Sequence, residues 1–128
     1  MAHCTVEYTD NLGREGDIPA LLWKLAAKFS DSGGVFPIGG VRVRAIRLTE
    51  YVIADGAEND GFVNITVKMG AGRDPEFKKR FFGEMFDIVK DHFAGLYEKR
   101  YLALSLYVDE ADENGSFKQN NIHARFKK

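Results

Sequence analysis

Residues 62–96 read FVNITVKMGAGRDPEFKKRFFGEMFDIVKDHFAGL, and this stretch decides the fold. The apolar residues between Phe62 and Met69 predict a strand. A glycine-rich turn, residues 70–73, then leads to Asp74 and Pro75, a helix cap followed by a first-turn proline. The stretch therefore predicts a strand that is followed directly by a helix.

Within this helix the apolar residues recur at helical spacing. They form one wide stripe, made of Phe77, Phe81, Met85, Ile88, Val89, Phe93 and Leu96, while charged residues keep the other side in water. The stripe predicts that the helix buries one face and continues to Leu96. Residues 101–108, YLALSLYV, predict the next strand.

The first half of the chain shows the same order of elements. Alternating residues from Cys4 to Tyr8 predict a strand, and Asp17 with Pro19 marks the start of a helix. A connection rich in glycine and serine, residues 30–40, precedes a second strand that begins at Val41. From there a hairpin-like stretch, residues 51–53, is expected to reach a turn at residues 55–56.

Strand, helix and strand thus occur twice, which predicts an α/β fold. We expect two consecutive β-α-β units that form a four-stranded mixed sheet with two helices on one face. The 128 residues fit a single domain, 1–128, with an internal duplication of approximately 1–58 and 59–128. We expect the other sheet face to be apolar and to be covered by copies of the chain, which predicts a homo-oligomer.

Composition and charge exclude several classes of function. The net charge of −1 argues against a nucleic-acid-binding protein, and the basic groups at residues 78–80 and 127–128 fit a helix face and a chain end. No apolar run has the length of a membrane span or of a secretion signal. The single cysteine, Cys4, cannot form an intrachain disulfide, which favours a cytoplasmic location.

Several segments resemble the 5-carboxymethyl-2-hydroxymuconate isomerase family of the tautomerase superfamily. They lie in order along essentially the whole chain: residues 3–11 (HCTVEYTDN), 33–44 (GGVFPIGGVRVR), 68–73 (KMGAGR), 102–106 (LALSL) and 117–123 (FKQNNIH). Each is weak alone, and their order and spacing make the resemblance specific. The resemblance implies a tautomerase-like fold and a homotrimer, and it leaves residues 117–123 without an assigned role.

The resemblance also implies a chemistry. Members of the family move a proton within an unsaturated 2-hydroxy or 2-oxo polycarboxylate from aromatic-compound catabolism, and they need neither a cofactor nor a metal. Their base is an N-terminal proline amine, and arginines bind the carboxylates and polarise the carbonyl. The family's arginine positions fall on Arg42 and Arg73, which we expect to be both catalytic and substrate-binding. The only partners expected are a small polycarboxylate and further copies of the chain.

Physical arguments bear on these two arginines as well. Arg73 precedes a helix N-terminus, where backbone amides favour an anion. The alternative is that Arg73 is a solvated residue without a ligand. The alternative for Arg42 is that it is an ordinary exposed residue of the strand. Arg44 and Arg47 follow it closely and show that this strand tolerates exposed basic residues.

The sequence departs from the family at the catalytic position, because Ala2 stands where the family has proline. Once the initiator methionine is removed, Ala2 would offer a primary amine with an ordinary pKa of about 7.7–8.0, which nearby arginines would lower. An alanine amine is less fixed in direction than a proline amine. Three functions therefore stay open: an isomerase that uses the Ala2 amine, a tautomerase with a shifted substrate, and a non-catalytic or weakly active trimer that binds a polycarboxylate.

The remaining candidate groups fit structural roles better. His3, His92 and His123 share no ligand spacing, so core or hydrogen-bonded histidines are expected. Cys4 is expected to be a small buried hydrophobe and not a nucleophile, since no basic partner stands beside it in the sequence.

Overall fold

The computed structural model describes residues 1–127. Lys128, the last residue of the predicted domain and of the basic pair 127–128, lies outside the described residues. Its strands are β1 (Ala2–Thr9), β2 (Val41–Leu48), β3 (Gly61–Gly70) and β4 (Leu102–Ala111). Its α-helices are α1 (Ile18–Ser30), α2 (Pro75–His92) and α3 (Ala94–Lys99). Short 3₁₀ segments are η1 (Asp10–Gly16), η2 (Ile38–Gly40), η3 (Glu113–Gly115) and η4 (Ile122–Phe126).

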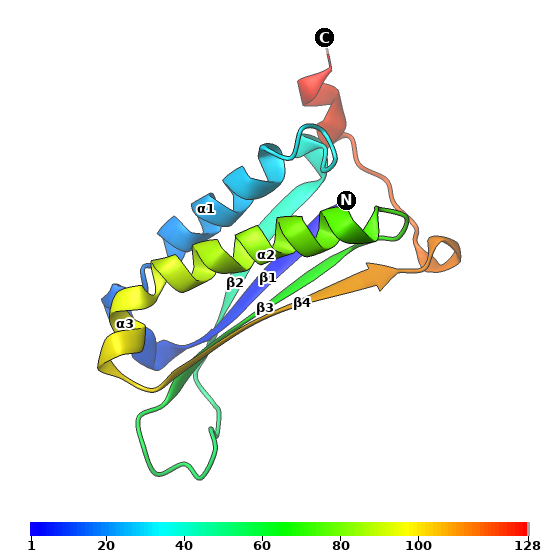
Figure 1. Cartoon of the computed structure of the whole chain (residues 1–128). Helices are drawn as coiled ribbons and strands as arrows, with labels where there is room; N and C mark the ends of the chain where they lie inside the picture. Colours follow the sequence, from blue (N-terminus) through cyan, green and yellow to red (C-terminus); the bar gives the residue numbers. More distant parts are fainter. Residues whose placement is uncertain (128) are drawn as a thin grey trace.

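The four strands form one mixed sheet in the order β2-β1-β3-β4. β1 is parallel to β2 and β3 is parallel to β4, whereas the central pair, β1 and β3, is antiparallel. Both α1 and α2 cover the same face of the sheet (Figure 1). The predicted fold class, two consecutive β-α-β units with both helices on one face, is therefore confirmed.

The hairpin-like stretch expected between β2 and β3 is wrong. β1 lies between these two strands, so they cannot pair with each other. Residues 49–60 instead form a connection across the end of the sheet, with the predicted turn closed by a hydrogen bond from Gly56 N to Ile53 O. Tyr51 holds this connection to the corner after β1, because its hydroxyl donates to Asp10 Oδ1 at 2.8 Å.

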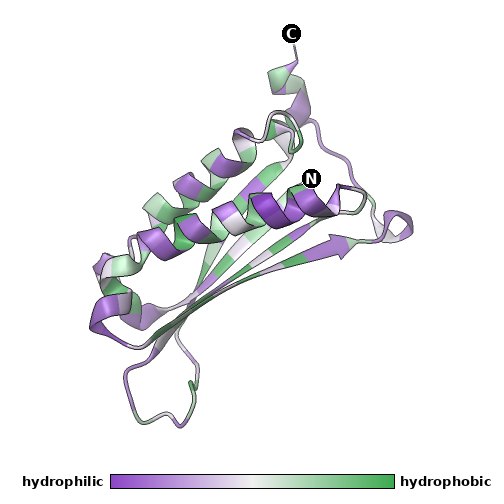
Figure 2. Cartoon of the chain, viewed as in Figure 1, coloured by the Kyte–Doolittle hydropathy of each residue, from purple (hydrophilic) through white to green (hydrophobic). Residues whose placement is uncertain are grey.

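The core lies between the helices and the inner sheet face. Apolar and polar segments alternate along the strands and around the helices (Figure 2), as a two-layer arrangement requires. Four buried phenylalanines from three segments pack edge to face or tilted within the core: Phe29, Phe36, Phe81 and Phe82. Phe82, which was outside the predicted stripe, is buried, and Ile88, which was inside it, is half-buried.

Two details of the helices differ from expectation. The helix predicted to reach Leu96 ends at His92, and α3 begins after Phe93, whose φ and ψ are −100° and 10°. Asp74 caps α2 as predicted, because its carboxylate accepts from Phe77 N at 3.0 Å. Asp17 precedes α1 as predicted, but it lies in the left-handed region at φ 41° and its side chain makes no capping hydrogen bond.

The open face of the sheet is mostly polar, so the expected apolar face is wrong. Side chains on this face bond to one another across strands: Arg44 with His3, Ser105 with Asn64, and Lys68 with Asp109. The physical reason is the period of a strand, which places Thr5 and Glu7 opposite the buried Cys4 and Val6. In residues 1–127, no helix has the length and hydropathy needed to cross a membrane.

Candidate active site

The candidate site lies where β1 begins. Because β2 runs parallel to β1 and β3 runs antiparallel, the starts of β1 and β2 meet the end of β3 at one edge of the sheet. The register pairs Ala2 with Val41 and His3 with Lys68. The topology therefore brings the predicted residues Ala2, Arg42 and Arg73 to the same end of the sheet, although they are far apart in the sequence.

Ala2 is buried in β1, and its nitrogen is an amide because Met1 precedes it. The free amine at the site is that of Met1. Burial, followed by the positive charges of Lys118, Arg73 and Arg42 in that order, lowers the pKa of this amine below its ordinary value of 8.0. A lowered pKa leaves more of the amine neutral near pH 7, and a neutral amine can accept a proton.

Arg42 is half-buried and is the second residue of β2. Its Nη1 donates to Gly39 O at 3.0 Å and to Val41 O at 3.1 Å. These two bonds use one nitrogen, so Nε and Nη2 make no hydrogen bond with the described residues. No Asp or Glu among residues 1–127 forms an ion pair with Arg42, which leaves its charge for a ligand.

Arg73 is half-buried and is held by the backbone on two sides. Its Nη1 donates to Gly70 O at 3.1 Å, its Nη2 donates to Val35 O at 3.2 Å, and its guanidinium carbon lies 4.4 Å from the centre of the Phe36 ring. Its Nε is buried and has no hydrogen-bond partner among the described residues. Arg73 is therefore not fully solvated, because it joins the end of β3 to residues 35–36, and its role toward a ligand stays a prediction.

The helix N-terminus beside Arg73 is already capped by a carboxylate of the protein itself. The Asp74 carboxylate already accepts from Phe77 N there, so the protein supplies its own anion. We therefore expect a ligand carboxylate to be bound mainly by the side chains of the site.

Sequence reasoning missed Lys118. The chain returns to the start of β1 after β4, and Lys118 Nζ lies 3.6 Å from the position that a Cβ on Gly70 would take. Lys118, Met1, His3, Lys68 and Gly70 line a common cavity of about 270 Å³. The only signal was the family-like segment 117–123, to which no role could be assigned.

The three histidines differ in their surroundings. His3 lies at the site, where burial, then Arg44, Arg42 and the Met1 amine, lower its pKa. His92 lies at the far side of the molecule, with Nε2 2.8 Å from Gly16 O and Nδ1 2.9 Å from Lys24 Nζ, so the expected hydrogen-bonded role is confirmed. His123 packs against the turn before β2.

Cys4 has the predicted character of a buried hydrophobe. It is fully buried on the inner face of β1, and burial raises the pKa of its thiol to about 12. Within residues 1–127, no three His, Cys, Asp or Glu side chains are grouped so that they could hold a metal ion.

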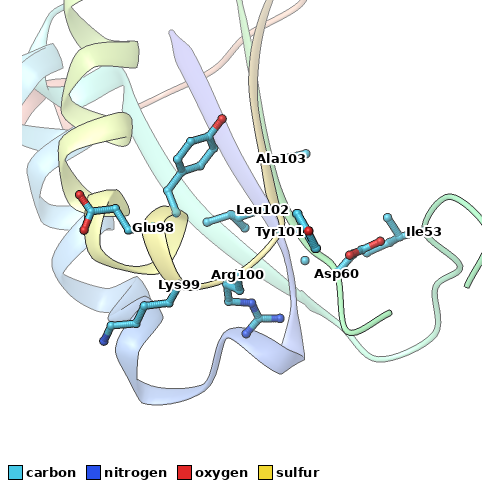
Figure 3. Close-up of a pocket in the computed structure, with 10 residues that line it drawn as sticks. Ile53, Asp60, Glu98, Lys99, Arg100, Tyr101, Leu102 and Ala103 are labelled. Atoms are coloured by element: carbon cyan, nitrogen blue, oxygen red, sulfur yellow. The ribbon is translucent and has the colours of Figure 1, made fainter. Parts of the chain in front are cut away.

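A larger cavity, of about 660 Å³, lies at the opposite end of the sheet (Figure 3). It is lined by residues that include Asp60, Arg100, Tyr101 and Ala103. Arg100 is committed to the backbone there, because its Nη1 donates to Asn11 O at 2.7 Å and its Nη2 to Asn59 O at 2.8 Å. None of the predicted site residues faces this cavity.

Comparison with known proteins points to one family. The sequence matches the family model described as 5-carboxymethyl-2-hydroxymuconate isomerase over residues 2–126. It is 39% identical over 127 residues to 5-carboxymethyl-2-hydroxymuconate Delta-isomerase of Escherichia coli. The alignment covers 99% of this chain and 100% of that protein.

Solved structures agree with this result. The fold is similar to the crystal structure of a 5-carboxymethyl-2-hydroxymuconate isomerase from Deinococcus radiodurans R1, with a TM-score of 0.95, 45% identity, and coverage of 99% of this chain and 95% of that one. A more distant likeness, to a fused 4-OT described as a symmetric trimer, has a TM-score of 0.64, 17% identity, and coverage of 91% and 92%, and it shows the fold alone.

Proposed function

Because this chain belongs to the 5-carboxymethyl-2-hydroxymuconate isomerase family and is an isomerase of the tautomerase superfamily, we propose that it acts on 5-carboxymethyl-2-hydroxymuconate or a close relative from aromatic-compound catabolism. One observation carries this proposal. The chain terminus, whose partly buried Met1 amine has a lowered pKa, lies near Lys118, Arg73 and Arg42, and none of these three cations is paired with a carboxylate among residues 1–127.

In the proposed reaction, the amine takes the proton of the substrate's 2-hydroxyl group and delivers it to a carbon of the same molecule, which converts the enol to the 2-oxo isomer. The intermediate is an enolate conjugated with carboxylates, so negative charge develops beside the guanidinium groups of Arg42 and Arg73. Fixed cations stabilise this charge with little reorganisation, because Arg42 and Arg73 are already held by backbone carbonyls.

We assign the base to the α-amine of Ala2 once Met1 has been removed. With Met1 present, the free amine lies about one residue, ~3.8 Å, further along the chain, and the nitrogen of Ala2 is an amide that cannot accept a proton. The Ala2 amine would lie closer to the start of β2, since Ala2 pairs with Val41. Arg42 and Arg73 are assigned to bind the substrate carboxylates and to polarise the carbonyl.

The test of this assignment is the processed Ala2→Pro variant. Both proteins are prepared without Met1, as verified by mass, and isomerisation of 5-carboxymethyl-2-hydroxymuconate is followed by its ultraviolet absorbance. Proline fixes the direction of the amine, so the rate constant should rise about tenfold to a hundredfold. If both proteins bind the substrate but neither moves a proton, the reading as a non-catalytic binding protein replaces this proposal.

We also propose a homotrimer, on grounds other than the sheet face first expected. Apolar side chains are exposed at both sheet edges: Trp23, 79% exposed, lies beside Val41 and Val43 at the β2 edge, and Tyr97, 61% exposed, lies beside Leu104 at the β4 edge. Two different patches at opposite edges suit head-to-tail contacts, which close into a ring.

Light scattering tests the proposed assembly. The expected result is three times the monomer mass. Trp23→Glu should reduce this mass, and Ala27→Glu, on an exposed position of the same helix, is the control that should not. A monomer that keeps full activity would refute the trimer.

The cytoplasmic location inferred from the single cysteine stays a prediction.

A further inference from the structure

We propose that Lys118 is the residue that selects a substrate with three carboxylates over one with two, by binding the carboxymethyl arm. This inference rests on the proposed function, because it names the part of the polycarboxylate that each cation of the site recognises.

The position of Lys118 is the first reason. Its Nζ lies over the end of β3, 3.6 Å from where a Cβ of Gly70 would stand, and the carbonyl of Gly70 accepts the hydrogen bond from Arg73 Nη1. Lys118 and Arg73 therefore approach the same residue from different segments. A side chain at position 70 would occupy the space beside the ammonium group, so Gly70 keeps that space open.

The availability of its charge is the second reason. Neighbouring lysines are already paired, since Lys68 Nζ lies 3.5 Å from Asp109 and Lys78 Nζ lies 2.6 Å from Glu110. Lys118 forms no ion pair with any Asp or Glu within residues 1–127. Its charge acts on the Met1 amine, whose pKa it lowers more than either arginine does.

The third reason is that the segment carrying Lys118 is anchored to the site. Asn120 Nδ2 donates to Gly39 O at 2.8 Å, and the same carbonyl accepts from Arg42 Nη1 at 3.0 Å. Ile122 N donates to Asn120 Oδ1 at 2.9 Å, which fixes the direction of the Asn120 side chain. One backbone oxygen therefore links Arg42 to a point two residues from Lys118.

The count of charges completes the argument. The muconate skeleton carries two carboxylates and the carboxymethyl arm carries a third. Arg42 and Arg73 are held rigidly near the base, where they can bind the two carboxylates of the skeleton that becomes the enolate. Lys118 lines the cavity, is more exposed than Arg42 and Arg73, and carries its charge on a flexible four-carbon side chain, so it is assigned the third carboxylate.

A pair of unreactive ligands tests this assignment without turnover: hexanedioate and 2-(carboxymethyl)hexanedioate, which differ only by the carboxymethyl arm. Calorimetry gives the dissociation constant of each, and their ratio cancels any effect that the charge of Lys118 has on the amine. In Lys118→Gln the preference for the tricarboxylate should fall about tenfold, at the low end for a hydrogen bond to a charged group. Lys118→Arg should restore it, and Lys79→Gln, an equal change of charge at an exposed residue of α2, should leave it intact.

A preference that is unchanged in Lys118→Gln, or a loss that is equal for both ligands, overturns the proposal. The isomerase assay of the unsubstituted protein is run in parallel. Selective binding that depends on Lys118 without isomerisation would support Lys118 and refute the proposed activity. Isomerisation with a tricarboxylate preference that does not depend on Lys118 would support the proposed activity and refute the role of Lys118.

Discussion

His123 lies directly against Gly39: a Cβ at position 39 would be 2.7 Å from His123 Nδ1 and 2.8 Å from His123 Cα. The second atom belongs to the backbone, so a side-chain rotation cannot relieve the contact. Only glycine allows the segment with Lys118 and Asn120 to pack on the turn that leads to Arg42.

Gly39→Ala should therefore loosen the C-terminal segment. We expect faster proteolysis of residues 112–127 and a loss of unfolding free energy of about 1–3 kcal/mol, the usual cost of an overpacked site. Gly83→Ala is the matched control, because no atom lies within 4 Å of a Cβ there and alanine is the better helix former. It should stabilise the protein by about 0.5–1 kcal/mol. Equal effects of the two substitutions would contradict the packing at Gly39.

Arg73→Lys should lower the free energy of unfolding by about 1–2 kcal/mol, although it keeps the charge. The lysine cannot donate to both Gly70 O and Val35 O, and it loses the planar contact with Phe36. Chemical denaturation measures this, with Arg80→Lys on the exposed side of α2 as the control. An unchanged midpoint would mean that the two backbone hydrogen bonds contribute nothing to the fold.

The rate of isomerisation should rise with pH, with a midpoint below the ordinary amine pKa of 8.0. The base acts when neutral. Burial, Lys118, Arg73 and Arg42 lower the pKa of the Met1 amine, and we expect the same surroundings to lower the pKa of the Ala2 amine once Met1 is removed. Removing a positive charge must raise that pKa, so the midpoint in Lys118→Gln should move to higher pH. Profiles of kcat/KM from pH 5 to 9 show both effects. A midpoint above 8, or a shift to lower pH in the variant, is incompatible with an amine base beside these cations.

The thiol of Cys4 should resist reagents while the protein is folded. Its pKa of about 12 leaves almost no thiolate at pH 8, and it is fully buried. Titration with a disulfide reagent should show no reactive thiol in buffer and one thiol per chain in denaturant. Rapid labelling of the folded protein at pH 8 would contradict the packing of the inner face of β1.

The parts of the fold that local chemistry determines could be predicted from the sequence. The start of α2 follows from Asp74 and Pro75, which act within one turn of the chain. The pairing of β1 with β3 could not be predicted in this way, because it joins residues about 60 positions apart and no local pattern records it. The local sequence favoured a hairpin between β2 and β3. The pairing of β1 with both strands places β1 between them, which excludes that hairpin.

The candidate site divides in the same way. Arg42 and Arg73 could be predicted as site residues because the segments around them resemble a known family. The carbonyls that hold Arg73 could not be predicted, because they belong to residues 35 and 70, which no sequence pattern connects. Lys118 lies in an irregular segment without periodicity, so only the folded chain shows its position. The polar character of the open sheet face could be predicted from the sequence, because Thr5 and Glu7 alternate with the buried Cys4 and Val6.

The antiparallel pairing of β1 with β3 also determines how many ligands one chain can hold. The two β-α-β units run in opposite directions, so the start of β3, paired with Leu102, corresponds to the start of β1, paired with Val41. That second start borders the cavity of Figure 3. There the chain continues through Asp60, so no terminal amine exists, and the residue in the place of Arg42 is Ala103. The proposed site therefore has no counterpart among the described residues of the second half of the chain, and a saturated protein should carry a single ligand per chain, not two.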